Sequence, residues 1–444
     1  MFSLYKKAYA GLSTSTWILA VVLLINRCGA MVIPFMTVYL TQQLHFSVQQ
    51  AGLVMTCYGI GGIVGAFSGG RLSDRYGFYP VQFWSLLLQG LIFLVLGQMH
   101  TLLQFCICIF ILSAVGDAFR PANTAATAHY SSPENRTRSY SLNRLASNLG
   151  WSIGPAVGGI VASYSYHLLF WVDGLTCVVA IIVMRLMIPP VHVAVKRHDG
   201  ESAGAEGESV NNGKSGSVNN GKIEHVDNGE TGRINKGKQA RVNQPKRDSV
   251  YKDKIYLAFI ALSILFTTGF LQLSTMVALY FKEVLHLEEA QIGMVLGLNG
   301  LLVAAIEMVL IYKIENMKHP LEFMTRGVAL ASLAYLSFNI LPAAGFVSIV
   351  FIVLFTAGEM LSIPFMTAFF ISRSGEHNRG QYAALYTVSF AVSTILSPTI
   401  GSATIAHFGF KVWWYVAAGF CLIAAVGFNF LYQKVTAKKG SYAV

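Results

Sequence analysis

Charged residues are scarce in this chain of 444 residues, where Asp, Glu, Lys and Arg together make up only 12%. A soluble globular protein carries about 25% of these residues, so this composition argues against a water-exposed surface. Hydrophobic residues reach 54% and occur in continuous runs of the length that spans a bilayer core, about 20 residues. Continuous rather than alternating runs favour helices over a β-barrel. The sequence therefore predicts an all-α membrane protein.

Motifs for catalysis, metal binding and nucleotide binding are also lacking. The six cysteines have neither zinc nor redox spacing, and all fall inside apolar runs, where packing is the expected role. We find no nucleophile–base pair and no phosphate-binding loop in the sequence. These absences argue against an enzyme, and they imply no metal and no cofactor. A membrane-bound enzyme or sensor is the alternative class, and movement of a solute across a vesicle membrane would exclude it.

Apolar runs recur along almost the whole chain, and we interpret them as twelve transmembrane helices. The predicted spans are 17–40, 50–70, 81–99, 102–129, 138–163, 167–188, 255–281, 290–312, 321–342, 346–372, 380–406 and 411–433.

Positive charges are unevenly divided between the two sets of loops. The predicted outer loops hold Lys282 and Lys411, whereas the loops of the other side and both ends of the chain hold many more Lys and Arg residues. Because such loops stay in the cytoplasm, both termini are predicted to be cytoplasmic. This bias and the central segment account for the net charge of +11, so no nucleic-acid partner is needed. The expected location is a bacterial cytoplasmic (inner) membrane.

Residues 189–252 interrupt the pattern, because they are rich in Gly, Asn, Lys, Ser and Glu and poor in large apolar residues. Such a segment cannot bury enough apolar surface to fold, so we interpret it as a disordered cytoplasmic linker. It divides the chain into two predicted six-helix bundles, residues 1–188 and 253–444. The role of the linker is not specified by its sequence.

The two predicted bundles share a sequence pattern. Blocks of the first half match the second half at a nearly constant spacing: Tyr39, Leu44-His45 and Gly52 match Tyr280, Leu285-His286 and Gly293, and Pro121, Pro155, Gly158 and Trp171 match Pro364, Pro398, Gly401 and Trp414. Two similar halves in the same orientation are a known plan of transporters, in which the substrate binds near the midplane between them.

The loop after the second predicted span carries the first family motif. It reads Gly70-Arg71-Leu72-Ser73-Asp74-Arg75-Tyr76-Gly77 and resembles the loop signature of the major facilitator superfamily. The resemblance covers all of the chain except the linker, and it implies two pseudo-symmetric six-helix bundles and a monomer. In such a loop Asp74 and Arg75 would form a conformational latch through charge pairs, and Gly70 and Gly77 would permit close approach and a tight turn. Phe78 and Tyr79 replace the basic residues that usually follow.

The fifth predicted span carries the second motif, which consists of Gly150, Gly154, Pro155, Gly158 and Gly159. It resembles the signature of the family's proton-driven antiporters, which implies export. Small residues at this spacing let two helices pack closely, and the proline bends the span. A plain packing motif in an importer is the alternative.

Glu359 is the sharpest candidate for proton coupling, because it lies at the middle of the tenth predicted span. A charge in that position is costly and is a functional candidate by default. The Gly358-Glu359 pair followed by Pro364 resembles multidrug antiporters in which this glutamate takes part in proton coupling. A structural hydrogen bond to a neighbouring helix is the alternative.

Asp117 and Arg120 share one face of the fourth predicted span, and Arg27 lies in the middle of the first. Asp117 can pair with either arginine, and a static ion-pair network is the alternative to a role in coupling. In the family fold the first, fourth, seventh and tenth spans line the cavity. This implies a substrate cavity with the following side chains: Asn26, Arg27, Phe35, Arg120, Asn123 and Phe365. Glu307 and Asp173 lie nearer span ends and are predicted to be structural.

These residues predict a secondary active transporter whose two bundles rock about a central site. The leading hypothesis is proton-coupled efflux of amphipathic small molecules, with Glu359 and Asp117 as the proton-coupling carboxylates. The alternative is a proton symporter that imports a polar solute such as a peptide, a sugar or an organic anion. Arg27 and Arg120 favour the alternative, and the glycine motif of the fifth span favours export.

Overall fold

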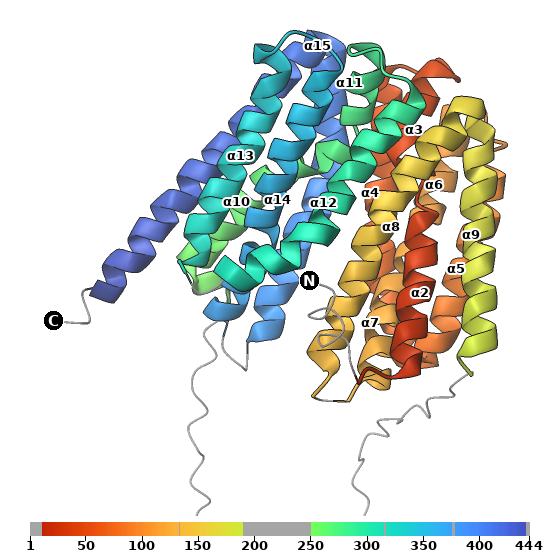
Figure 1. Ribbon diagram of the computed structural model, residues 1–444, viewed down its shortest axis with the longest axis horizontal. Coiled ribbons are helices and arrows are strands. Elements are labelled where there is room, and N and C mark those ends of the chain that lie inside the picture. Colours follow the sequence, from red (N-terminus) through yellow and green to blue (C-terminus); the bar gives the residue numbers. More distant parts are fainter. Residues whose placement is uncertain (1–10, 133, 190–249, 315–316, 375–377, 441–444) are drawn as a thin grey trace, which may run out of the picture. The chain divides into compact units, whose positions relative to one another are not determined.

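The computed structural model describes residues 11–132, 134–189, 250–314, 317–374 and 378–440, so the predicted linker lies outside the described residues except at its two ends. Within these ranges all regular structure is helical, and the helices belong to one compact unit (Figure 1). Their bounds are α2 Thr14–Cys28, α3 Val32–Gln42, α4 Val48–Tyr76, α5 Phe78–Leu96, α6 Leu102–Asp117, α7 Phe119–Tyr130, α8 Arg136–Tyr164, α9 Tyr166–Met187, η1 Val250–Lys252, α10 Lys254–Phe270, η2 Leu271–Ser274, α11 Val277–Glu283, α12 Glu289–Ile314, α13 Pro320–Ile340, α14 Phe346–Arg373 and α15 Arg379–Gly440.

Nine helical segments of the described chain are long and apolar enough to cross a membrane. The ninth, Gly380–Ala437, contains two helices, because Gly409 (φ 80°, ψ 171°) interrupts α15. Helices α8 and α13 are 29 and 21 residues long, which also suffices to span, but they are less apolar. The prediction of an all-α membrane protein is confirmed, and the count of twelve spans stays a prediction.

Large apolar side chains are exposed on many helices of the unit. Examples are Phe67, Trp84, Leu103, Leu175 and Leu186, of which Leu186 is 79% exposed. A water-soluble monomer seldom presents so much apolar surface, whereas the lipid of a bilayer covers it without cost. The molecule is therefore a multi-pass membrane protein.

The internal repeat is visible in the backbone. His45 and His286, which match each other in the sequence repeat, both have a positive φ, of 55° and 53°. His45 follows the short helix α3, and His286 follows the short helix α11. Each helix ends in the same way: the amide of Phe46 donates to the carbonyl oxygen of Leu40, and the amide of Leu287 donates to the carbonyl oxygen of Phe281. A shared, uncommon conformation at matched positions supports the duplication inferred from the sequence.

The first helix of each bundle is broken at mid-length. Between α2 and α3, the buried carboxylate of Asp173 in α9 accepts hydrogen bonds from the amides of Met31 and Val32, at 2.9–3.2 Å. Between α10 and α11, η2 is held by Gln272, whose Nε2 donates to the carbonyl and hydroxyl oxygens of Ser397. At this second break the hydroxyl groups of Tyr335 and Thr37 donate to the carbonyl oxygens of Gly269 and Thr275. Both breaks thus expose backbone groups in the interior and satisfy them with side chains, as a membrane interior requires. The structural role predicted for Asp173 agrees with these bonds.

Polar contacts join the two bundles near one end and also further along α8 and α12, where Arg144 pairs with Glu307. We call the end marked by Thr14, Tyr76, Tyr130, Met187 and Lys254 the terminal end, and the other the opposite end. Near the opposite end, polar contacts join the bundles in the pairs Thr37–Thr275, Gln42–Glu283, Gln49–His407, Thr56–Thr399 and Tyr166–Glu289. The principal helix pairs between the bundles are α8–α12 and α4–α15 (Figure 1).

Asp253 organises the terminal end of the second bundle. Its carboxylate caps α10 by accepting from the amide of Tyr256, and it binds Arg373 through two hydrogen bonds of 2.6 and 2.7 Å. The hydroxyl of Tyr382 donates a further bond of 3.0 Å. Partial burial raises the pKa of Asp253, but the bonds from Arg373, Tyr256 and Tyr382 outweigh it, and the pKa lies below its ordinary value.

This pKa predicts how stability depends on pH. Because the pKa of Asp253 is lower in the folded state, its charged form stabilises the fold fully at pH values above the ordinary Asp pKa of about 3.9. This stabilisation is lost as the pH falls through the lowered pKa. We expect Asp253→Asn to lower the free energy of unfolding at pH 7 by about 1–2 kcal/mol, because the pair is only partly shielded from solvent. Thermal unfolding in detergent at several pH values measures this.

The difference between wild type and Asp253→Asn should shrink as the pH falls below about 4. Glu322→Gln serves as control, since Glu322 is an acidic residue paired on a helix surface with Lys318 and Arg326. An Asp253→Asn effect no larger than that of the control at pH 7 would contradict the prediction.

Candidate functional site

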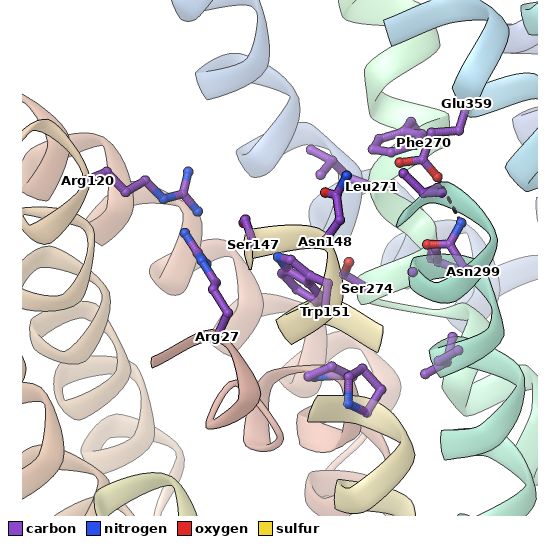
Figure 2. Close-up of a pocket in the computed structure, with 16 residues that line it drawn as sticks. Arg27, Arg120, Ser147, Asn148, Trp151, Phe270, Leu271, Ser274, Asn299 and Glu359 are labelled. Carbon is purple, nitrogen blue, oxygen red and sulfur yellow. Dashed lines mark hydrogen bonds between the residues drawn. The ribbon is translucent and has the colours of Figure 1, made fainter. Parts of the chain in front are cut away.

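A cavity of about 430 Å³ lies between the two bundles (Figure 2). Its walls come from both halves of the chain: Arg27, Pro34, Arg120, Ser147, Asn148, Trp151, Pro155, Phe270, Leu271, Leu273, Ser274, Leu296, Asn299, Gly300, Val303 and Glu359. A second cavity of about 300 Å³ shares Arg120, Trp151, Leu271 and Ser274 with it and runs between α4 and α15. Both broken helices, α2–α3 and α10–η2, contribute residues near their breaks.

Glu359 is positioned on the wall of the second bundle by close packing of α14. Gly358 fits against α13, where an added β-carbon would lie 2.6 Å from the carbonyl oxygen of Gly327. The adjacent Glu359 lines the cavity, where Asn299 of α12 donates from Nδ2 to its Oε2 at 2.8 Å (Figure 2). Asn299 also contacts the hydroxyl of Thr356 one turn earlier in α14. Among the described residues no cation is paired with Glu359.

The wall of the first bundle carries two guanidinium groups and one carboxylate. Arg120 Nε lies 2.9 Å from Asp117 Oδ1, so Asp117 pairs with Arg120 rather than with Arg27. Ser113 donates a weaker bond of 3.4 Å to the other oxygen of Asp117. Arg27 lies beside this pair, and its buried Nε has no hydrogen-bond partner among the described residues. This wall therefore holds one more positive than negative charge.

The glycine motif of α8 determines where Arg27 lies. Gly150, Gly154 and Gly158 form one stripe at four-residue spacing that packs on the end of α2 and the start of α3. A β-carbon at Gly150 would lie 2.3 Å from Cβ of Arg27, and one at Gly158 would lie 2.9 Å from Cβ of Met31. Any larger residue would displace α2, because backbone and β-carbon have little freedom to move away.

The fifth residue of the motif, Gly159, faces the other bundle. A β-carbon there would lie 2.8 Å from the Cα of Gly293 in α12, and one at Gly293 would lie 2.4 Å from the carbonyl oxygen of Pro155. Helices α8 and α12 thus touch through their backbones near the opposite end. One short motif both fixes Arg27 at the cavity and closes the bundles against each other.

The sequence matches the family described as "Major Facilitator Superfamily" over residues 18–398. This chain belongs to the Major Facilitator Superfamily. Its all-helical fold, its duplicated halves and its central cavity are those expected from the loop and helix motifs, so the resemblance inferred from the sequence is confirmed. The superfamily consists of membrane transporters, and this member has the architecture of one.

Two sequence relatives within the superfamily show how its members vary. A "Na(+), Li(+), K(+)/H(+) antiporter" of Planococcus maritimus is 23% identical over 432 residues, which cover 92% of each chain. "Multidrug resistance protein MdtH" of Proteus mirabilis is 30% identical over 131 residues, which cover 29% of this chain and 32% of that protein.

Solved superfamily structures share the fold. A crystal structure of the peptide transporter POT in complex with sulfate superposes with a TM-score of 0.74 at 14% identity, covering 96% of both chains. An in meso crystal structure of the POT family transporter PepTSo superposes with a TM-score of 0.72 at 15% identity, covering 95% of this chain and 98% of the other. At these identities the likeness concerns the fold alone.

The superfamily's loop motif lies at the terminal end of α4. Gly77 has a φ of 87° and separates α4 from α5 without an intervening loop, which a residue with a β-carbon would adopt only with strain. Asp74 and Arg75 are exposed, and the guanidinium of Arg75 lies 5.3 Å from the ring centre of Tyr76. No hydrogen bond or ion pair joins either charge to the second bundle within the described part of the chain. The latch role of Gly70, Asp74, Arg75 and Gly77 stays a prediction.

The structure places the other residues predicted for the cavity in three different surroundings. Asn26 donates to Gln89 at 3.4 Å and borders a small pocket behind Arg27. Asn123 accepts a bond from Gln82 inside the first bundle. Phe35 is fully buried, and Phe365 stacks on Phe323 inside the second bundle. The structure therefore does not bring Phe35, Asn123 and Phe365 to the wall of the central cavity.

Several cavity residues escaped the sequence reasoning, notably Ser147, Asn148, Trp151, Ser274 and Asn299. Asn299 had a usable signal, because it is a polar residue in the middle of an otherwise apolar span. The others lie in stretches where polar and small residues are common, and only the packing of α8 and η2 decides which of them face the cavity.

Proposed function

We propose that this protein is a secondary active transporter that exports amphipathic small molecules in exchange for protons by alternating access. The observation that carries the proposal is the carboxylate of Glu359 on the wall of a cavity formed by both bundles. Burial disfavours the charged form of a carboxylic acid, and Glu359 has an amide rather than a cation as its bonded partner. A proton can therefore be taken up and released there as the surroundings change.

Alternating access follows from where the bundles touch. Five polar contacts lie near the opposite end, where α8 and α12 also meet through Gly159 and Gly293. Arg144 and Glu307 join the same two helices in their terminal halves. We propose that the cavity is open toward the terminal end, which faces the cytoplasm according to the distribution of positive charges. A second state would close that end through the loop motif of α4 and part the opposite end. The carrier would act as a monomer in a bacterial inner membrane.

The direction of export rests on the glycine motif of α8, which resembles that of proton-driven antiporters. A second candidate is symport of a polar solute with protons. The polar part of the cavity wall favours it, since Arg27, Arg120, Asn148 and Asn299 all line the space. The two candidates share the site and differ only in whether proton and substrate exclude or accompany each other.

Proton movement in liposomes tests the proposal. The purified protein is reconstituted in vesicles that contain a pH-sensitive dye and is challenged with lipophilic drugs, peptides, sugars and the salts of Na⁺, Li⁺ and K⁺. The cations are included because one relative is named as an antiporter for them. Protein-free vesicles correct for weak acids and bases that cross the bilayer unaided.

We expect an amphipathic compound to drive protons across the membrane opposite to its own movement. Movement of a polar solute together with protons would replace export by the second candidate. Proton movement driven only by metal cations, or none with any compound, would refute both.

A further inference from the structure

The two arginines on the wall of the first bundle are incompletely neutralised. Asp117 pairs with Arg120, while Arg27 has neither a salt bridge nor a hydrogen-bond partner for its buried Nε among the described residues. Figure 2 shows the two guanidinium groups pointing toward each other at the cavity wall. The pocket behind them is bordered by the neutral groups of Tyr58 and Gln89 and by Asp117, which already pairs with Arg120.

Other acidic groups of the region are already engaged. Glu307 pairs with Arg144, Asp173 binds the amides at the break between α2 and α3, and Glu359 is bonded to Asn299 on the opposite wall. The excess positive charge beside Arg27 is therefore not cancelled by a described side chain. An unpaired charge inside a protein is costly, and an anion that enters the cavity would remove that cost.

Arg27 is also held ready for such a ligand. Gly150 and Gly154 pack on its Cβ and its carbonyl oxygen, so its backbone has little room to shift. A guanidinium presents parallel N–H donors that match the two oxygens of a carboxylate or the oxygens of a phosphonate or sulfonate. A side chain whose backbone is already held at the site loses less entropy on binding than one on a mobile segment.

The remaining walls describe the other part of the ligand. Trp151, Phe270, Leu271 and Leu296 give the cavity an apolar lining next to the arginines. We propose that Arg27 and Arg120 form a clamp for the anionic group of the substrate, and that the substrate is an amphipathic organic anion with an aromatic or aliphatic body. The inference rests on the proposed function only in taking this cavity as the substrate site, whichever way the substrate moves.

Three matched probes test the charge preference by calorimetric titration of the purified protein in detergent. They are 1-naphthylacetate, its neutral amide 1-naphthylacetamide, and the cation 1-naphthylethylammonium. Charge-assisted hydrogen bonds are about twice as strong as neutral ones, so we expect the anion to bind about tenfold more tightly than the amide, and the cation more weakly still. Equal binding of the three probes, or binding of none, would overturn the proposal.

Variants assign the preference to the clamp. Arg27→Gln should remove most of the roughly tenfold advantage of the anion over the amide, and Arg27→Lys should retain part of it, because it keeps the charge but loses the planar fork. Arg326→Gln is the matched control, since Arg326 is an exposed arginine paired with Glu322 on α13. Unchanged preference in both Arg27 variants would also overturn the proposal.

Failure of this inference can be told apart from failure of the proposed function. Binding in detergent requires no proton movement, so an anion preference without proton movement in liposomes supports the clamp and refutes coupling. Proton movement driven equally well by neutral, cationic and anionic amphiphiles supports coupling and refutes the clamp.

Discussion

Glu359→Gln is expected to abolish substrate-driven proton movement and to leave the protein folded and able to bind its substrate. Glutamine has nearly the same size, and its side-chain oxygen can still accept the hydrogen bond that Asn299 donates at 2.8 Å. It cannot release or take up a proton near neutral pH, so proton and substrate lose the group through which their binding is linked. Dye-monitored proton movement in liposomes measures the loss, which should reach the level of protein-free vesicles.

Glu359→Asp is the matched control, because it keeps a carboxylic acid on a shorter side chain. It should retain part of the proton movement, whereas Glu359→Gln should retain none. Asp117→Asn gives a second comparison, since the partner of Asp117 is the cation Arg120. If Glu359→Gln moves protons as well as wild type while Asp117→Asn does not, the coupling site lies on the first bundle and the role assigned to Glu359 is wrong.

The second large effect concerns an ion pair that joins the bundles: substituting one partner is expected to reduce stability much more than substituting the other. Arg144 of α8 pairs with Glu307 of α12, and Asn148 donates to the same carboxylate at 3.4 Å. The Glu307 side chain is 5% exposed and that of Arg144 is 45% exposed. Arg144→Gln therefore leaves a buried charge without its cation, whereas Glu307→Gln leaves a charge that water can reach.

We expect Arg144→Gln to lower the free energy of unfolding by about 3 kcal/mol and Glu307→Gln by about 1 kcal/mol or less. The double variant should be more stable than Arg144→Gln, because it removes the unpaired carboxylate together with its partner. Thermal unfolding of the four proteins in one detergent measures these differences. Equal destabilisation by the two single changes would show that the pair is solvated on both sides.

The class of fold was predictable from the sequence because it depends on features that do not require packing. Runs of about 20 apolar residues indicate spanning helices, and matched blocks such as Leu44-His45 and Leu285-His286 indicate duplication. The structure shows that these matched histidines share the same positive φ. The bonds of Asp173 to the amides of Met31 and Val32 agree with the structural role predicted for it, and they depend on the break in the first helix, which the apolar runs do not reveal.

The site was predictable only in part. Glu359, Arg27 and Arg120 were found because a charge inside a membrane span is rare and costly. The same reasoning could not choose between Arg27 and Arg120 as the partner of Asp117, since that depends on how α2 packs against its neighbours. Phe35 and Phe365 were expected at the cavity and are buried elsewhere, because the face that a helix turns inward is determined by contacts such as those of Gly150 and Gly358.

The backbone contact between Gly159 and Gly293 has a consequence for energy conservation. A carrier driven by a proton gradient must not let protons pass when no substrate moves, and protons leak along chains of water and polar side chains. At the contact between Gly159 and Gly293 neither residue has a side chain that could anchor such a chain, and the two backbones leave no room for a β-carbon between them. In the proton-driven carrier proposed above, this close contact would hinder the passage of protons between the bundles at the opposite end.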